Sequence, residues 1–302
     1  MQEFRTLELN LEQDFVQTRE RVAALVLAVS PRHDMGRIDR LFGLIARAYE
    51  GWLPGYQRLQ TFYHNHHHTL EVALCAARLL HGLHLSGRTP GPDGIDLTLM
   101  GALLHDVGYL KRSDEVAGTG AQFAPDHVAR GIEFARAHLA AEPAAFLDGL
   151  ANVILVTDHH LPVDRLHFSS AEEELAGLAT GTADLVSQMA NREYLERLLL
   201  LYFEFREAGI GNYSGFDELL EKTVAFYRLT RERLDGPLQG LSAYLAKHFE
   251  KTEGVCRNRY QESIDKNLAY LGLILQQSHD RRLAMLRRGG IVERMRQRLE
   301  NP

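Results

Sequence analysis

The sequence has 302 residues, of which 45% are hydrophobic and 25% are charged, and its formal net charge is −6. That length allows one large domain or two, and the composition is ordinary for a globular protein. The negative charge gives no support for binding to nucleic acid or to an anionic membrane surface.

Targeting and redox signals are sparse. No apolar run approaches the ~20 residues that span a bilayer, and the first residues lack the basic-then-apolar form of a signal peptide. Cys75 and Cys256 are the only cysteines, which excludes a disulfide framework and a cysteine-rich zinc site. We therefore expect a cytoplasmic protein without a membrane partner.

The first elements read as helices. Apolar periodicity predicts a helix over 11–29 and a second over 36–50, which Gly51 ends. We assign residues 1–55 to N-terminal helices that pack on a core domain. No stretch of β alternation has convincing length anywhere in the chain, so we predict an all-α fold.

A histidine-rich segment opens the next predicted helix, over 65–85. Four histidines fall within five positions, and His64 and His68 are four residues apart, so one helical face would carry both. Imidazole is a common metal ligand and also titrates near neutral pH. For the neighbouring His66 and His67 we expect solvated or supporting roles. After a loop over 86–94, Asp96 is a candidate cap of the following helix.

Ionisable residues then end or interrupt apolar segments at three places. His105-Asp106 closes the run 99–104, His159 and His160 follow the run 153–156, and Asp184 lies inside an apolar stretch. Charged groups at such positions are costly unless they are paired or coordinated. Together with the histidine segment they predict a metal centre.

The connections between these sites are a long loop over 107–124 and three predicted helices. Pro125 begins a helix that carries His127, Pro143 begins one that runs to His159, and residues 171–190 form one or two short helices. We place the metal-dependent catalytic core at residues 56–190.

Residues 191–302 are predicted to form a C-terminal helical extension within the same globule, with a turn at 209–215. Ile264, Leu268, Leu271 and Leu275 have heptad-like spacing, which indicates either a packed helix or a self-association seam. A homodimer through the C-terminal helices is thus one expectation.

The predicted ligands are nitrogen and carboxylate donors, a set that suits iron, manganese, zinc, cobalt or, with waters, magnesium. They are His68, His105, Asp106, His127, His159 and Asp184. Asp106 could bridge two cations, whose charge would assist phosphoryl transfer by activating a water. His64, one turn from a ligand, is the natural proton donor.

These residues resemble a known signature. The pattern of His68, His105-Asp106 and Asp184 is similar to that of the HD superfamily of metal-dependent phosphohydrolases. The segment from Tyr63 to His68, read as Tyr-His-Asn-x-x-His, resembles the opening motif of class I cyclic nucleotide phosphodiesterases. The resemblance covers about residues 56–190.

The resemblance implies an HD-domain-like helical bundle with additional N- and C-terminal helices. It assigns catalysis to His64 as general acid and Asp106 as the carboxylate shared between metals, with two divalent ions (iron, manganese, zinc or magnesium). The substrate would be a cyclic mononucleotide or cyclic dinucleotide whose phosphodiester is hydrolysed. Asn65, His160 and Lys111 are the candidate substrate contacts.

Two other functions remain open from the sequence. The same six ligands would suit a diiron oxygenase related to myo-inositol oxygenase. A non-catalytic nucleotide or metal sensor is the third alternative. Bound iron with oxygen consumption would indicate the oxygenase, and nucleotide binding without hydrolysis would indicate the sensor.

Overall fold

The computed structural model describes the backbone of residues 3–300 and the side chains of residues 13–279 and 281–295. Within these residues the chain forms thirteen α-helices and no strand beyond an isolated bridge between Tyr56 and Arg112. The all-α prediction is confirmed. The first seven helices are α1 (Glu3–Val29), α2 (Gly36–Glu50), α3 (His66–Leu85), α4 (Pro92–Leu104), α5 (His127–His138), α6 (Ala144–Leu155) and α7 (Ala171–Ala190). The others are α8 (Tyr194–Ala208), α9 (Phe216–Asp235), α10 (Leu245–Glu253), α11 (Arg259–Leu275), α12 (His279–Met285) and α13 (Ile291–Glu300).

Helices α3, α4 and α7 form the centre of the molecule. Helix α3 packs against α1, α4, α7 and α10, and α7 packs against α3, α4, α6 and α11. Helices α3 and α7 are buried over most of their length, because their small and apolar residues lie on all sides of the helix rather than along one stripe. Polar side chains on these helices, including the predicted ligands His68 and Asp184, are therefore held away from water.

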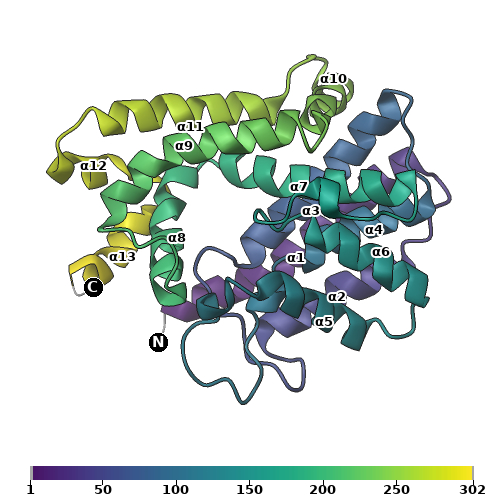
Figure 1. Cartoon of the computed structure of the whole chain (residues 1–302), viewed down its shortest axis with the longest axis horizontal. Coiled ribbons are helices and arrows are strands. Elements are labelled where there is room, and N and C mark those ends of the chain that lie inside the picture. The colour runs from purple at the N-terminus through teal and green to yellow at the C-terminus, as the bar shows by residue number, and fades with distance from the viewer. Residues whose placement is uncertain (1–2, 301–302) are drawn as a thin grey trace.

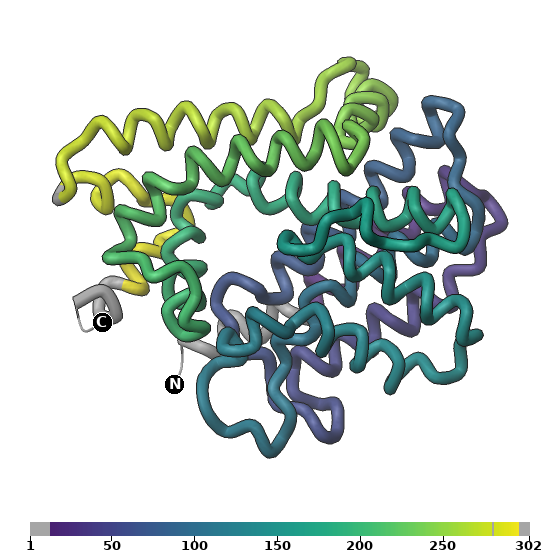
Figure 2. Tube along the Cα trace, viewed as in Figure 1, coloured from purple at the N-terminus to yellow at the C-terminus, as the bar shows by residue number. Residues whose placement is uncertain are grey.

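The C-terminal helices form an arm beside this centre. Figure 1 shows α9 and α11 running side by side along one edge, with α8 running downward at the left, beside α13. The same arrangement is visible in the trace of Figure 2. Buried residues from α1, α4 and α11 belong to one contiguous apolar cluster. The predicted division at 55 and 190 stays a prediction.

Two predicted boundaries are wrong. Helix α4 begins at Pro92 with Gly91 as its N-cap, so Asp96 lies inside the helix rather than at its start. Its carboxylate is buried and binds His33 (2.9 Å) and Arg37 (3.1 Å), a use that local spacing does not reveal. Helix α6 ends at Leu155, four residues before His159.

The heptad-like residues of α11 pack inside the chain. Ile264 and Leu271 are buried, and Leu268 and Leu275 are partly buried against the same cluster. Helix α11 contacts α7, α9 and α10. Intramolecular packing thus accounts for the spacing, and the homodimer stays a prediction. In the described part of the chain, none of the helices combines the length and apolar character needed to cross a bilayer.

A buried histidine pair joins α3 to α10, and it makes stability sensitive to acid. His81 Nδ1 lies 3.0 Å from His248 Nδ1. Burial, aided by Arg78 and His81, lowers the pKa of His248 to about 4, and burial also lowers that of His81. Below pH 6.5 the unfolded chain therefore binds protons that the folded protein excludes.

We expect the free energy of unfolding to fall between pH 6.5 and 4, by roughly 2 kcal/mol from His248. Urea denaturation of the wild type and His248→Asn at both pH values measures this contribution, because asparagine does not titrate. The exposed His160→Asn serves as the control. An equal pH dependence in the wild type and His248→Asn would contradict the prediction.

Candidate metal centre

Four predicted ligands converge in the buried centre from three separate places in the chain. His68 lies in the first turn of α3, His105 and Asp106 follow α4 directly, and Asp184 lies within α7. All four side chains are at most 8% exposed. His68, His105 and Asp184 offer ligand atoms that all lie within 4.8 Å of one another, a buried group that could hold a metal ion.

The distances within this group are those of atoms that share one cation. His68 Nε2 is 3.2 Å from His105 Nε2, 3.3 Å from Asp106 Oδ2 and 3.4 Å from Asp184 Oδ1. His105 Nε2 is 3.1 Å from Asp106 Oδ2. Ligands about 2.1 Å from one metal stand about 3.0–3.4 Å apart, so small adjustments would complete the first coordination sphere.

His127 extends the group through the second oxygen of Asp106. Its Nε2 lies 3.7 Å from Asp106 Oδ1, whereas His68 and His105 lie near Asp106 Oδ2. It is the first residue of α5, which a close approach to the turn after Asp106 holds in place. The two oxygens of Asp106 thus face different imidazoles, as the predicted bridging of two ions by Asp106 requires.

Gly108 makes this approach possible. A Cβ at this position would lie 1.9 Å from the carbonyl oxygen of His127. We expect Gly108→Ala to displace α5, destabilise the fold by about 1–3 kcal/mol and weaken metal binding. Gly272→Ala is the control, because a Cβ there meets open space. Thermal denaturation and metal titration measure both effects, and unchanged values for Gly108→Ala would refute the packing argument.

The donor set fits a metal in two respects. The Nδ1 atoms of His105 and His127 lie within hydrogen-bond distance of the carbonyl oxygens of Ala102 (2.9 Å) and Ala124 (2.7 Å), which leaves each Nε2 for a ligand bond. Asp106 Oδ2 is buried and has no hydrogen-bond partner among the described residues. A buried carboxylate oxygen without a donor is costly, and a cation would satisfy it.

The histidines and carboxylates of this group shift one another's pKa values toward the charged forms. Burial alone would lower the pKa of His68, but the adjacent carboxylates of Asp106 and Asp184 raise it to about 10. Burial would raise the pKa of Asp106, but His105 and His64 hold it well below its ordinary value. The two carboxylates therefore remain ionised in the interior, where positive charge beside them is favoured.

His64 lies at the accessible edge of the group, held by a carboxylate that sequence reasoning missed. Its Nδ1 is 2.5 Å from Glu204 Oε2, and Glu204 Oε1 accepts a hydrogen bond from the Tyr63 backbone N–H (2.6 Å). Glu204 belongs to α8, outside the predicted core of residues 56–190, and its side chain is 2% exposed. It follows the apolar run 198–203, the same signal that singled out His105-Asp106.

Tyr109 is a second missed residue. Its ring stacks on His64 (centroids 4.4 Å apart, planes 13° apart) and, on its other side, on His127 (4.7 Å, 20°). Tyr109 follows Asp106 in a short 3₁₀ turn, Val107–Tyr109, and is buried. The tyrosine thus fixes the spacing between the predicted acid and the outermost ligand.

His159 is not part of the group. It lies in the turn after α6, its ring meets Phe226 edge to face (centroids 6.4 Å), and it is outside the set of ligand atoms within 4.8 Å. Burial lowers the pKa of His159 and the Asp184 carboxylate opposes that shift, so the ring lies within electrostatic reach of Asp184 and its role as a ligand stays a prediction. Because α6 ends at Leu155, a turn positions His159 rather than the helix itself.

The three predicted substrate contacts have other roles or positions. Asn65 caps α3: its Oδ1 accepts from the backbone N–H of His67 and of His68, and its Nδ2 donates to Phe62. The Lys111 ammonium is buried and donates to the carbonyls of Gly118 (2.7 Å) and Val116 (3.4 Å), so it holds this loop, and its contact with substrate stays a prediction. His160 is exposed beside Asp158, and no described contact joins it to the metal group.

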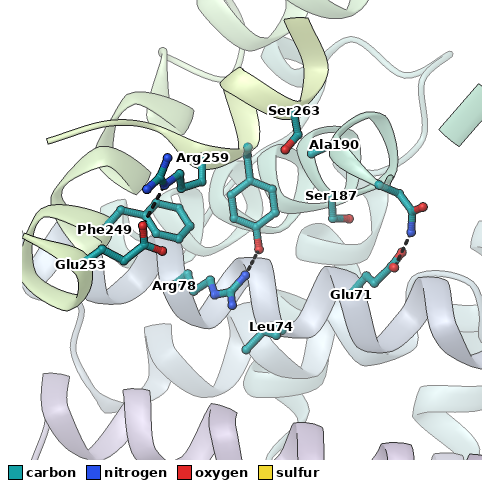
Figure 3. A pocket seen from close by; sticks show the side chains of 11 residues that line it. Glu71, Leu74, Arg78, Ser187, Ala190, Phe249, Glu253, Arg259 and Ser263 are labelled. Carbon is teal, nitrogen blue, oxygen red and sulfur yellow. Dashed lines mark hydrogen bonds and ion pairs between the residues drawn. The ribbon is translucent and has the colours of Figure 1, made fainter. Parts of the chain in front are cut away.

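A cavity of about 500 Å³ lies next to the centre but is separate from it. Figure 3 shows Arg78 and Glu71 of α3 facing Arg259 and Ser263 of α11 across it. None of the metal-group residues lines it, although Glu71 is one turn beyond His68 on the same helix. Charged residues that line it are paired, Arg259 with Glu253 and Glu71 with Arg197. We do not assign it to the substrate of the metal centre.

Comparison with known proteins gives one partial match. A family model described as Npun_R2479-like matches residues 114–233, which is less than half of the chain. The matched segment contains His127, Asp184 and Glu204, and it leaves out His64, His68 and the His105-Asp106 pair. No curated protein and no solved structure matches the chain.

Proposed function

We propose that the protein is a metal-dependent phosphohydrolase that cleaves a nucleotide phosphodiester, with a cyclic mononucleotide or cyclic dinucleotide as substrate. The observation that carries the proposal is the pairing of a proton donor, His64 held by Glu204, with a buried His/Asp ligand group directly beside it. The resemblance of the Tyr63–His68 segment and of His105-Asp106 to the HD superfamily supports the same class.

His68, His105, Asp106 and Asp184 would hold one divalent ion, and Asp106 and His127 would hold a second. The donors suit iron, manganese or zinc, and magnesium if waters complete its shell. When bound, the ions would neutralise charge on the phosphate oxygens and lower the pKa of a water. Two free cysteines, buried Cys75 and exposed Cys256, support a cytoplasmic location.

The substrate would approach at the side of His64 and His127. Their side chains are 17% and 22% exposed, whereas those of His68 and His105 are 4% and 2% exposed. A phosphate placed at this edge would lie next to both the ligand group and the acid. Negative charge on the phosphate is attracted by bound cations and not by the chain, whose net charge is negative.

His64 would give a proton to the leaving oxygen. With its Nδ1–H donated to Glu204, Nε2 is the remaining nitrogen that can carry the transferred proton. Stacking on Tyr109 limits rotation of the ring about the Glu204 bond. The Glu204 contact and the stacking on Tyr109 thus support Nε2 of His64 as the proton donor.

The test is hydrolysis by the metal-reconstituted full chain. The panel contains 3′,5′-cyclic mononucleotides, cyclic dinucleotides and bis(p-nitrophenyl) phosphate, assayed with manganese, iron, zinc and magnesium. Turnover of at least one phosphodiester supports the proposal. The absence of turnover with every combination of substrate and metal, at full metal occupancy, would contradict it. Oxygen consumption by an iron-loaded chain would favour the diiron oxygenase.

Glu204 is proposed as a positioning residue for His64. We expect Glu204→Gln to lower kcat by about 10- to 100-fold, the loss typical when a partner that orients a functional histidine is removed. The Michaelis constant and metal content should stay unchanged, which separates an effect on proton donation from an effect on binding. Glu207→Gln, which alters a loop contact to Thr119 instead, is the matched control. An equal effect of both variants would argue against the assignment.

A further inference from the structure

A second group of metal-type donors lies where α1 crosses the start of α3. Asp14 of α1 and the adjacent His66 and His67 offer ligand atoms within 4.8 Å of one another. We expected solvated or supporting roles for both histidines, but the side chain of His66 is only 14% exposed. Its Nε2 is buried and has no hydrogen-bond partner among the described residues. The expectation of solvation is therefore wrong for His66, because α1 covers the first turn of α3.

The distances favour coordination over hydrogen bonding. Asp14 Oδ2 lies 3.6 Å from His66 Nε2 and 3.6 Å from His67 Nδ1. Both separations exceed the usual range of an N–H···O hydrogen bond. Two ligands of one tetrahedral ion, each about 2.1 Å from it, stand about 3.4 Å apart. The central group, with separations of 3.1–3.7 Å, has the same spacing.

The two imidazole rings are arranged to reach one point. Their centroids are 3.9 Å apart and their planes differ by 38°, although neighbouring helical residues ordinarily diverge. The cap at Asn65 fixes the backbone of this turn by accepting from the N–H groups of His67 and His68. The nitrogen atoms are thus presented to Asp14 from a rigid turn.

We propose that Asp14, His66 and His67 form a separate binding site for a borderline divalent cation such as Zn²⁺, with water completing the coordination. Two imidazoles and one carboxylate suit zinc, nickel or copper better than calcium or magnesium, which take oxygen ligands. The ion would link α1 to the turn of α3 that carries His68. Its role is to hold that turn, and it does not depend on the reaction at the central group.

Cobalt titration of the chelator-treated full chain tests the site. Calorimetry and the visible d–d absorption of Co²⁺ give the number of equivalents bound. We expect Asp14→Asn and, independently, His67→Gln to bind one equivalent fewer than the wild type. Glu20→Gln, on the same helix and exposed, should bind as the wild type does. Equal equivalents and equal affinity in the wild type, Asp14→Asn and His67→Gln would overturn the proposal.

A stability measurement separates this site from the central one. In a background with both Asp106→Ala and Asp184→Ala, which removes the two carboxylates of the central group, Zn²⁺ should still raise Tm by about 5 °C at saturating concentration. Adding Asp14→Asn should abolish that shift while circular dichroism shows intact helices. A zinc-dependent shift that persists after Asp14→Asn is added would overturn the proposal, whether or not the protein hydrolyses phosphodiesters.

Discussion

Under the proposed function, Asp106→Ala should prevent metal binding and, with it, abolish essentially all phosphodiesterase activity. The two oxygens of Asp106 face different imidazoles: Oδ2 lies near His68 and His105, and Oδ1 lies near His127. Its loss would therefore weaken both ion positions at once. Since metal-ion stabilisation of a phosphoryl transition state is worth several kcal/mol, we expect a fall in kcat/KM of about 10³-fold or more.

Metal analysis after dialysis and phosphodiester assays measure the two effects. The exposed Asp164→Ala, on the turn 163–165, is the matched control and should keep metal and activity. Circular dichroism checks that Asp106→Ala retains its helices. A variant that lost activity but kept full metal content would show that Asp106 is not a shared ligand.

His64→Ala should also lose turnover but, unlike Asp106→Ala, should keep the metal. His64 is not within the group of ligand atoms, and its contacts are Glu204 and the stacked Tyr109. Positioned proton donors contribute about 10²- to 10⁴-fold to rate, so kcat should fall by that amount. The loss should be smallest for substrates with a good leaving group such as p-nitrophenolate, because that oxygen leaves without a proton.

The comparison of cyclic nucleotides with bis(p-nitrophenyl) phosphate makes this a test of role. His167→Ala, an exposed histidine outside the site, is the control. If His64→Ala slowed both substrates equally, His64 would be acting on binding or on the ions and not on the leaving oxygen. If it slowed neither, the assignment of the acid would be wrong.

The sequence predicted the all-α fold and the convergence of His68, His105, Asp106 and Asp184, because each lies at the end of, or within, an apolar helix. A polar residue in such a place needs a partner, and the centre of a bundle is where partners meet. His127 was also predicted, and the structure places it 3.7 Å from Asp106. Its position depends on the Gly108 contact, which is a tertiary feature.

Other positions could not be predicted from the sequence, because turns and tertiary contacts place them. His159 was assigned to the centre from its place after an apolar run and from the resemblance, but α6 ends at Leu155 and a turn positions the residue. Lys111 was assigned to substrate from the resemblance, but it holds a loop through two carbonyls. Glu204 was overlooked because the predicted core ended at 190, although the apolar run before it gave the same signal as His105-Asp106.

The ligands of the proposed metal centre and the carboxylate that orients His64 come from different parts of the chain. Every residue of the ligand group comes from α3 to α7, whereas the carboxylate that orients His64 comes from α8, the first helix of the C-terminal arm. A displacement of α8 would therefore act directly on the orientation of the proposed proton donor, His64, and on none of the ligand side chains. Under the proposed function, substitutions or partners acting on α8 could slow or restore turnover while the protein stays fully loaded with metal.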